Sequence, residues 1–215
     1  MKQIKKKKTK ANSPGSLPPL ANFVYEVGIL ASTPRSGLWF LGTGQQSVAE
    51  HLLRTAYITY ALSHYTLGID KYKAVMMALT HDLGEGRTSD HNYVHQKYGR
   101  LAESEALADL ARTVSFGDDL VSWHAEEQAR RTPEAMLVKD ADQLEWIATL
   151  RTEEVKGNKK AKVWAAIAYK RLKTKPGRQL GKELIKTNPD EWWFNAKDKW
   201  WVDRKPEKKD GISRA

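Results

Sequence analysis

The chain has 215 residues, of which 40% are hydrophobic and 29% charged, with a formal net charge of +10 and no cysteine. This length suits one compact domain with tails, and the lack of cysteine excludes disulfides and thiolate-bound metals, so that any metal must be held by His, Asp, Glu or water. No apolar run approaches the roughly 20 residues that a membrane span needs, and the Lys-rich start lacks the apolar segment of a secretory signal, so we expect a cytoplasmic protein without membrane contact.

The positive charge is concentrated towards the two ends of the chain. Residues 1–10 carry six Lys and no acidic residue, and residues 156–215 carry 18 Lys and Arg against seven Asp and Glu. Residues 11–155 carry 12 basic against 19 acidic side chains. A nucleic-acid duplex binds to a basic surface, whereas an acidic centre with interspersed histidines is typical of a cation site. The pattern favours a metal site in the middle and leaves nucleic-acid binding by the basic flanks open.

Helical patterns account for most of the chain between two tails. Residues 1–19 combine a lysine run with Ser, Pro and Gly and predict a disordered basic tail. The glycine-rich residues 32–46 predict a structured loop. Ser47 and Glu50 have the spacing of a capping box, in which the serine is the N-cap of a helix that runs to about Tyr65. Helices are expected at residues 20–31, 47–65, from after Asp70 to Gly84, and at 93–114, 118–131, 133–149, 161–174 and 178–187.

The absence of any convincing alternating strand pattern or internal repeat predicts an all-α fold. We expect one helical domain over 20–187, between basic N- and C-terminal extensions. The C-terminal extension, residues 188–215, is rich in Trp and Lys, and its aromatic cluster comprises Trp192, Trp193, Phe194, Trp200 and Trp201. We expect these rings to pack onto the domain or onto a subunit partner; stacking on the bases of single-stranded nucleic acid is the alternative.

Imidazole and carboxylate groups recur at the ends of the expected helices. His51 opens one helix, and His81 and Asp82 close the next. Consecutive helical residues point about 100° apart, so His81 and Asp82 approach one ion together most easily at a helix end. Asp140 and Asp142 lie on a later helix, and either of them can complete the set. Such ligands without thiolate suit divalent Mn, Fe, Co, Ni or Zn.

Three short motifs carry a resemblance to a known family. They are the segments 47–51 (Ser-Val-Ala-Glu-His), 78–85 (Ala-Leu-Thr-His-Asp-Leu-Gly-Glu) and 138–145 (Val-Lys-Asp-Ala-Asp-Gln-Leu-Glu). In this order they resemble the H…HD…D signature of the HD superfamily, and most closely that of the HD-domain 5′-deoxynucleotidases. The similarity covers roughly residues 20–150, and the two flanking tails do not share it.

The resemblance implies an HD-domain helical bundle with one divalent metal ion, bound by His51, His81, Asp82 and Asp142. The family's final ligand follows a Val-Lys-x-x pattern, which selects Asp142 over Asp140, a choice that helical periodicity leaves open. The implied metal is Co, Mn, Fe, Ni, Zn or Mg. The implied partners are a small-molecule nucleotide substrate and a second copy of the chain in a homodimer.

The resemblance also supplies catalytic and substrate-binding positions. The family has a Glu three residues after the HD aspartate and an Asp five residues beyond it, and Glu85 and Asp90 match these positions. One of the two would position or deprotonate water, and the other would deliver a proton to the leaving 5′-oxygen. The family's substrate-side Arg matches Arg35 and its companion Trp matches Trp39, although the spacing differs. Lys97 is a candidate phosphate contact, or else a solvated helix residue.

Other ionisable residues near these motifs have plainer interpretations. His91 and His95 lie four residues apart and form either a second metal pair or exposed side chains at the mouth of the pocket. We expect His124 to be structural. Arg54 and Lys139 lie close to proposed ligands, and we expect them to balance the charge of the acidic cluster.

Together these residues predict a metal-dependent phosphohydrolase that removes the 5′-phosphate from (deoxy)nucleoside monophosphates. A deoxynucleoside triphosphate triphosphohydrolase on the same fold is the first alternative, because the depth of the phosphate pocket rather than the metal ligands separates the two. A non-catalytic nucleotide- or RNA-binding HD module, in which the basic flanks matter most, is the second. A cyclic-dinucleotide phosphodiesterase is disfavoured, since the additional His motifs of the bimetallic relatives are not found.

Overall fold

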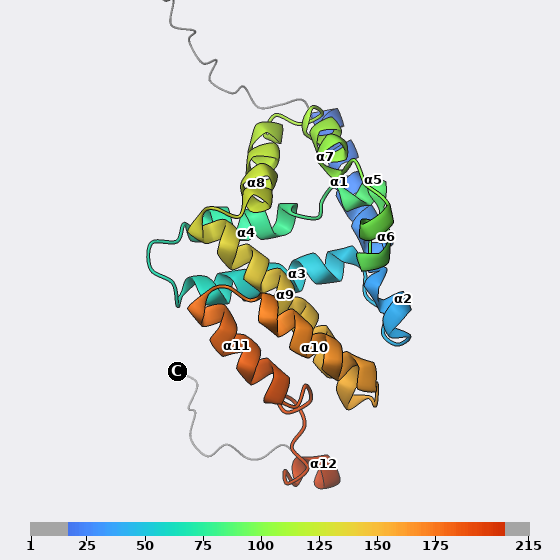
Figure 1. Ribbon diagram of the computed structural model, residues 1–215, viewed down its shortest axis with the longest axis vertical. Coiled ribbons are helices and arrows are strands. Elements are labelled where there is room, and N and C mark those ends of the chain that lie inside the picture. Colours follow the sequence, from blue (N-terminus) through green and yellow to red (C-terminus); the bar gives the residue numbers. More distant parts are fainter. Residues whose placement is uncertain (1–16, 205–215) are drawn as a thin grey trace, which may run out of the picture.

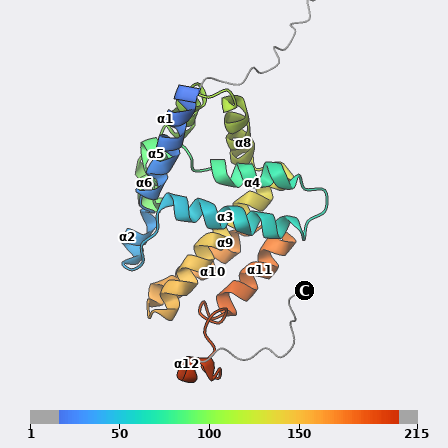
Figure 2. The ribbon, with the colours of Figure 1, turned by 180° about the vertical axis from the view of Figure 1, so that it is seen from behind.

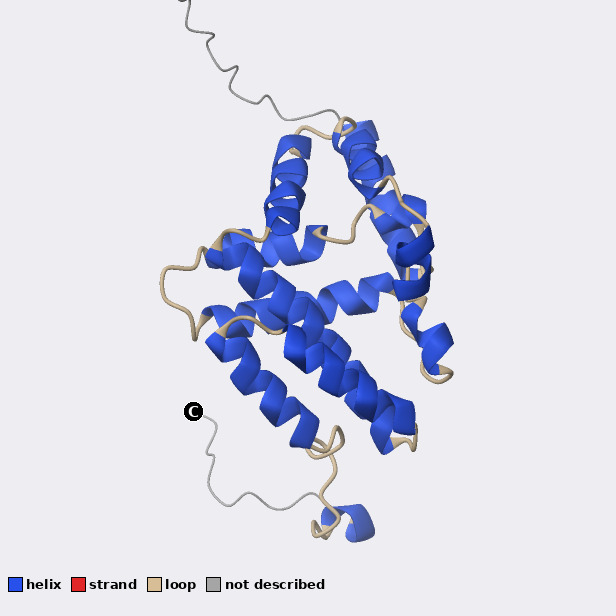
Figure 3. Cartoon of the chain, in the orientation of Figure 1, coloured by secondary structure: helices blue, strands red, loops and turns tan. Residues whose placement is uncertain are grey.

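The computed structural model describes residues 17–204, whose regular elements are helices joined by short loops (Figures 1, 2 and 3). They are α1 (Leu17–Gly28), the 3-10 turn η1 (Ile29–Ala31), α2 (Gly37–Leu41), α3 (Val48–Ser63), α4 (Lys71–Thr80), α5 (Glu85–Thr88), α6 (Tyr93–Tyr98), α7 (Glu103–Ala111), α8 (Gly117–Ala129), α9 (Pro133–Val155), α10 (Lys159–Arg171), α11 (Lys175–Lys186) and α12 (Trp200–Asp203). The all-α expectation is confirmed. Between residues 17 and 204, no helix is long and apolar enough to cross a lipid bilayer.

Helix α9 runs through the middle of the molecule and contacts α3, α4, α8, α10 and α11 (Figure 1). It begins where the Thr132 hydroxyl accepts a hydrogen bond from the Ala135 N–H, and Pro133 takes the first helical position, where no amide donor is needed. Its fully buried apolar side chains are Leu137, Val138, Leu144, Ile147 and Leu150. Because neighbours cover α9 on several sides, functional groups on this helix lie at the centre of the protein.

Helix α10 packs on α9 through a face made of alanine. The buried alanines of this face, spaced four and three residues apart, are Ala161, Ala165 and Ala168. Their small side chains let the two helices approach closely and share one core cluster with Leu144 and Ile147. At the end of α10 the chain is tied to α9 again, because the Asp140 carboxylate accepts hydrogen bonds from the backbone N–H groups of Lys173 and Thr174.

Helix α3 begins with the expected capping box. The Ser47 hydroxyl accepts a hydrogen bond from the Glu50 N–H at 3.2 Å, and the Glu50 carboxylate accepts one from the Ser47 N–H at 2.6 Å. These two bonds satisfy amide donors that have no partner inside the helix. The local sequence therefore sets where α3 starts, and with it the position of His51 in the first turns.

Helix α4 ends one turn earlier than the sequence indicates. Its last residue is Thr80, so that His81 caps the helix and Asp82 lies in the turn that follows, not in the last helical turn. Gly84 does not end the helical region, because α5 begins at the next residue, Glu85. A Cβ atom at Gly84 would lie 2.7 Å from the carbonyl oxygen of Glu103, so the close passage of α7 requires a glycine here.

Further boundaries also differ from the sequence-based expectation, and α9 continues past the expected end at residue 149 to Val155. The helix expected over 93–114 is divided into α6 and α7, because Gly99 leaves the helical conformation with φ −122° and ψ 160°. The loop expected over 32–46 contains α2, which ends at Gly42 in the left-handed conformation. Helix α1 begins at Leu17, inside the segment predicted as a tail. The rest of that tail, residues 1–16, lies outside the described residues.

The C-terminal aromatic residues form a cluster of their own. The rings of Trp193, Phe194, Trp200 and Trp201 contact one another with centroid separations of 4.8 to 5.6 Å. Trp192 remains 85% exposed. Ring-to-ring contacts within residues 193–201 therefore hold the cluster together and leave it partly open to solvent. Residues 205–215 of the predicted extension lie outside the described part of the chain.

Candidate metal centre and substrate cavity

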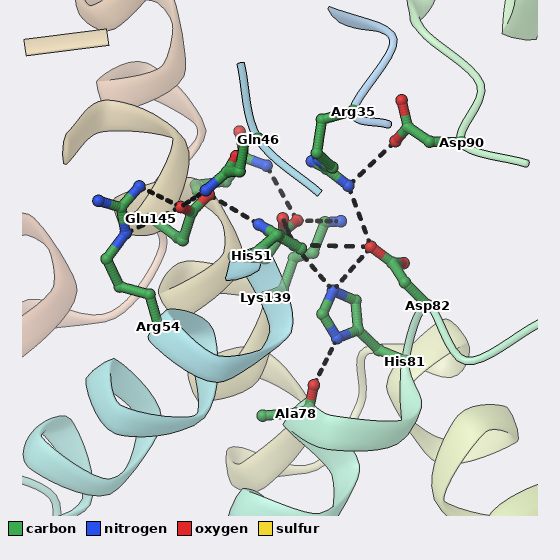
Figure 4. Close-up of polar contacts among 12 residues, drawn as sticks. Arg35, Gln46, His51, Arg54, Ala78, His81, Asp82, Asp90, Lys139 and Glu145 are labelled. Carbon is green, nitrogen blue, oxygen red and sulfur yellow. Dashed lines mark hydrogen bonds and ion pairs between the residues drawn. The ribbon is translucent and has the colours of Figure 1, made fainter. Parts of the chain in front are cut away.

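Four predicted ligands meet where α3, the end of α4 and α9 converge (Figure 4). The Nε2 atom of His51 lies 3.4 Å from Nε2 of His81 and 3.5 Å from Oδ2 of Asp82. It also lies 3.4 Å from Oδ1 of Asp142, and Nε2 of His81 lies 3.2 Å from Oδ2 of Asp82. Such separations are those of neighbouring ligand atoms held about 2.1 Å from one shared ion. Two imidazoles and two carboxylates therefore fit a single divalent cation.

Both histidines are oriented by a hydrogen bond on the ring nitrogen that faces away from the centre. The Nδ1 atom of His51 lies 2.7 Å from a carboxylate oxygen of Glu145, and Nδ1 of His81 lies 2.7 Å from the carbonyl oxygen of Ala78 (Figure 4). Because these partners are acceptors, each Nδ1 donates its proton, and each Nε2 faces the centre, where it can bind a cation once it carries no proton. Oriented imidazoles of this kind are typical of metal ligands.

Glu145, which was not predicted as a site residue, contacts the candidate ligand His51. It is fully buried and also accepts hydrogen bonds from Nε of Arg54 at 2.9 Å and from Nε2 of Gln46 at 2.5 Å. Burial raises the pKa of Glu145, but the hydrogen bond to His51 and the charge of Arg54 outweigh it and lower the pKa to about 2. One signal was available, because Glu145 lies three residues after Asp142 and so shares its helix face.

The ligand carboxylates are ionised at neutral pH. Burial raises the pKa of Asp82, but the neighbouring His81 and Arg35 lower it more, well below the usual range. The same holds for Asp142, where Lys139 and His51 oppose the effect of burial. Burial lowers the pKa of His81, yet the charge and hydrogen bond of Asp82 raise it to about 9. Without a cation the cluster therefore holds a proton that an arriving ion must displace.

Arg35 is held at the edge of the centre by two carboxylates. Its Nη1 atom lies 3.2 Å from Oδ2 of Asp82 and 3.0 Å from Oδ1 of Asp90 (Figure 4). The other oxygen of Asp90 accepts hydrogen bonds from the Ser36 backbone N–H and hydroxyl, at 2.6 and 2.8 Å. Both oxygens of Asp90 are thus engaged, and they tie the Arg35 loop to the segment that follows α5.

Glu85 has a different environment from the other acidic residues. It is 6% exposed, and its Oε2 atom has no hydrogen-bond partner among the residues described. Burial and the negative charges of Asp82 and Asp90 raise the pKa of Glu85 to about 10. A carboxyl group in this environment is protonated at neutral pH and can donate a proton.

A cavity of about 680 Å³ opens beside the centre, a volume that suits a nucleotide. The carboxylates that line it are Asp82, Glu85, Asp90 and Asp142. The cations that line it are Arg35, Arg130, Lys139, Lys170, Arg171 and Lys173. Tyr93, Met136 and Trp146 add apolar surface. One space therefore combines a cation site, phosphate-binding cations and surfaces on which a base can pack.

A family model described as "HD domain" matches residues 27–183, well over half of the chain. The chain belongs to the HD-domain family. A 5′-deoxynucleotidase of Dictyostelium discoideum is 33% identical over 113 residues, which cover 47% of this chain and 60% of that relative. A 5′-deoxynucleotidase of Danio rerio is 27% identical over 165 residues, 74% of each chain. A crystal structure of a Pyrococcus horikoshii protein is 29% identical with a TM-score of 0.65, covering 77% of this chain and 98% of that one.

Two predicted substrate-binding residues of this HD domain lie apart from the cavity. Trp39 is 62% exposed on α2 and contacts the ring of His95, with 6.2 Å between the centroids. It borders a different depression, which it shares with Arg35. Lys97 is exposed on α6, and its ammonium lies 5.3 Å from the ring centre of Tyr98. The division of the expected 93–114 helix at Gly99 places Lys97 on a short surface helix.

The remaining ionisable residues have structural contacts. His124 is buried and bonds through its ring nitrogens to the His81 carbonyl and the Ser104 hydroxyl, each at 3.2 Å. His91 and His95 have their rings 5.1 Å apart, and only the first of them borders the cavity. Asp140, the rival ligand by sequence, is 1% exposed and binds the chain after α10 instead of facing the centre.

Proposed function

We propose that this HD domain is a metal-dependent phosphohydrolase that removes the 5′-phosphate from deoxynucleoside monophosphates. The observation that carries the proposal is the meeting of His51, His81 and Asp142, whose ligand atoms all lie within 4.8 Å of one another. Both imidazoles are oriented, Asp82 lies 3.5 and 3.2 Å from their Nε2 atoms, and the group lies at the wall of a nucleotide-sized cavity. The names of two relatives, both 5′-deoxynucleotidases, support the substrate class.

In this proposal the four side chains hold one divalent ion. When bound, the ion supplies positive charge beside the phosphate and lowers the pKa of water that it coordinates. Arg35 and Lys139 border the cavity next to ligand carboxylates, at 3.2 Å from Asp82 and 2.7 Å from Asp142. Both can therefore bind oxygens of the same phosphate, and the guanidinium can do so in bidentate fashion. Asp90 keeps Arg35 in this position.

Glu85 is assigned as the proton donor to the leaving 5′-oxygen. It borders the cavity, its Oε2 atom is unpartnered among the residues described, and burial, Asp82 and Asp90 raise its pKa in the metal-free protein. An alkoxide is a poor leaving group, and a positioned acid typically accelerates such a step by 10²- to 10⁴-fold. Asp90 is the weaker choice for this role, because both of its oxygens already accept hydrogen bonds or pair with Arg35.

The experiment is a nucleotide panel with the purified protein loaded separately with Mn²⁺, Co²⁺, Ni²⁺, Mg²⁺ or Zn²⁺. Free phosphate released from dAMP, and lost in Asp82→Ala, is the expected result. Tripolyphosphate released from dATP, with dAMP left intact, would overturn the proposal in favour of a triphosphohydrolase. Retained metal without turnover of any nucleotide, together with salt-sensitive RNA binding, would favour a binding module.

The enzyme is further proposed to act as a homodimer. Helix α3 carries a stripe of exposed apolar side chains spaced four and three residues apart: Leu53, Tyr57 and Tyr60, which are 58%, 68% and 51% exposed. A stripe of this kind suits contact with a second copy. Light scattering is expected to give twice the chain mass, and Tyr57→Glu is expected to give a monomer. A monomeric wild-type protein at all concentrations tested would contradict this.

A further inference from the structure

The cavity contains more positive charge than a single phosphate requires. Arg35 and Lys139 lie beside the metal ligands and are paired with carboxylates. Four more cations border the same space, and we call them the basic wall: Arg130, Lys170, Arg171 and Lys173. Within residues 17–204, none of these four forms an ion pair with a carboxylate of the described side chains. Like charges gathered in this way repel one another unless an anion lies between them.

Two residues of the basic wall, Arg171 and Lys173, are positioned by neighbouring groups. The Asp140 carboxylate accepts hydrogen bonds from the backbone N–H groups of Lys173 and Thr174, at 2.8 and 2.7 Å. The guanidinium of Arg171 lies over the ring of Tyr93, 4.7 Å from its centre, and contacts its hydroxyl. Contacts of its side chain therefore position Arg171, and the backbone of Lys173 is anchored to α9.

Arg130 adds a conformational observation to the basic wall. It ends α8 in the left-handed region, with φ 51° and ψ 37°, where glycine or asparagine is the usual residue. Arg130 borders the cavity, so it adds a cation to the wall from the end of α8, whereas the other three wall residues lie at the end of α10 and just after it.

A short chain of polar contacts joins the basic wall to the metal centre. Nη1 of Arg171 lies 3.4 Å from the side-chain oxygen of Gln143, and the Gln143 amide donates to the Asp142 carboxylate at 3.1 Å. Only one side chain therefore separates Arg171 from a metal ligand. A group bound at the wall lies next to the scissile phosphate, within the span of one nucleotide.

We propose that the basic wall binds a second phosphate group of the substrate, so that the preferred substrates are nucleotides with two phosphates. This inference rests on the proposed phosphohydrolase function and goes beyond it, from monophosphates to nucleotides that carry a second phosphate. The second phosphate is attached either at the 3′-oxygen or to the 5′-phosphate itself. The net reaction is a hydrolysis in both cases: the bond between phosphorus and the 5′-oxygen breaks, the water oxygen joins phosphorus, and one proton goes to the 5′-oxygen. A 3′-phosphate stays on the nucleoside product, whereas a 5′-diphosphate leaves as pyrophosphate.

The test compares kcat/KM for dAMP, 2′-deoxyadenosine 3′,5′-bisphosphate and dADP with the metal-loaded full chain. A charge-assisted contact to phosphate corresponds to about a 10-fold or larger preference, so one of the two-phosphate nucleotides is expected to exceed dAMP by about that factor. Which of them does so identifies the position of the second phosphate. The double variant Lys170→Gln/Lys173→Gln is expected to reduce the preference to near unity.

The matched control is Lys162→Gln/Lys175→Gln, which removes the same charge from exposed positions of α10 and α11 outside the cavity lining. This variant is expected to keep the wild-type preference. The inference is overturned if the wild-type kcat/KM for each two-phosphate nucleotide exceeds that for dAMP by less than twofold. It is also overturned if this ratio is the same in the two double variants. Neither outcome affects the proposed hydrolysis of dAMP. If no nucleotide is hydrolysed, the proposed function fails instead. The inference is then decided by calorimetric affinities of the same nucleotides for the same variants.

Discussion

The hydrogen bond between His51 and Glu145 gives a quantitative prediction for the metal centre. The substitution Glu145→Gln keeps the size of the side chain but removes its charge. The contact is 2.7 Å long and both side chains are fully buried, so solvent does not weaken it. A hydrogen bond to a charged group contributes about 1.5–3 kcal/mol and one between neutral groups about 0.5–1.5 kcal/mol. The difference between the two hydrogen bonds is about 1–1.5 kcal/mol. The variant is therefore expected to bind the metal ion roughly 10-fold more weakly than the wild type.

The assay is a titration of the metal-free protein with Co²⁺, followed by visible absorption, alongside phosphate release from dAMP. Glu153→Gln is the matched control, because Glu153 lies on the same helix, is 4% exposed and pairs with Lys156 at 2.8 Å, away from the ligands. The control is expected to keep the wild-type metal affinity. If Glu145→Gln folds normally and binds Co²⁺ within twofold of the wild type, the orienting role of Glu145 is refuted.

Asp82→Ala is expected to lose both bound metal and activity while its circular dichroism stays helical; retention of both would show that Asp82 is not a ligand. Glu85→Gln is expected to lower kcat by about 100-fold or more at unchanged metal content, as a general acid requires, and a kcat near the wild-type value would remove this role. Because the pKa of His81 rises from 6.5 to about 9 in the folded protein without metal, its proton stabilises the fold fully below pH 6.5, and this stability is lost as the pH rises through 9. Metal affinity should rise over the same range as the proton is displaced, and thermal melts and Co²⁺ titrations at pH 6.5 and 9 check both trends.

The helix starts were accessible from the sequence because they depend on neighbours along the chain. The capping box of Ser47 forms as expected, and α9 begins at Pro133 as expected; both starts depend on residues at most three positions apart. Helix ends were harder to place. Helix α4 ends at Thr80, four residues before Gly84, and the close approach of Glu103 to Gly84 is a long-range contact that no local pattern records.

The metal ligands were predictable as residue types, but their selection needed more than periodicity. Asp140 and Asp142 lie two positions apart on α9, and the sequence alone offers both as ligands. In the folded chain the two side chains point to different neighbours: Asp140 binds the amides of Lys173 and Thr174, and Asp142 lies 3.4 Å from His51. The contact with α3 identifies Asp142 as the candidate ligand, and the contacts after α10 give Asp140 a structural role. Both partner segments are remote from α9 residues 140–142 in the sequence.

By itself, the sequence determined the all-α class, the positions where α3 and α9 begin, and the set of groups that can bind a divalent cation, since these follow from local spacing and residue chemistry. Only the tertiary structure decided how those groups are used. It brought Glu145 to His51 across 94 residues of chain, engaged both oxygens of Asp90 while leaving Glu85 buried, and placed Lys170 and Arg171 on the cavity while Trp39 and Lys97 remained outside it. Burial sets the charge state of each side chain, and distance sets which groups it can contact. Burial and distance both result from packing between helices that are remote from one another in the sequence.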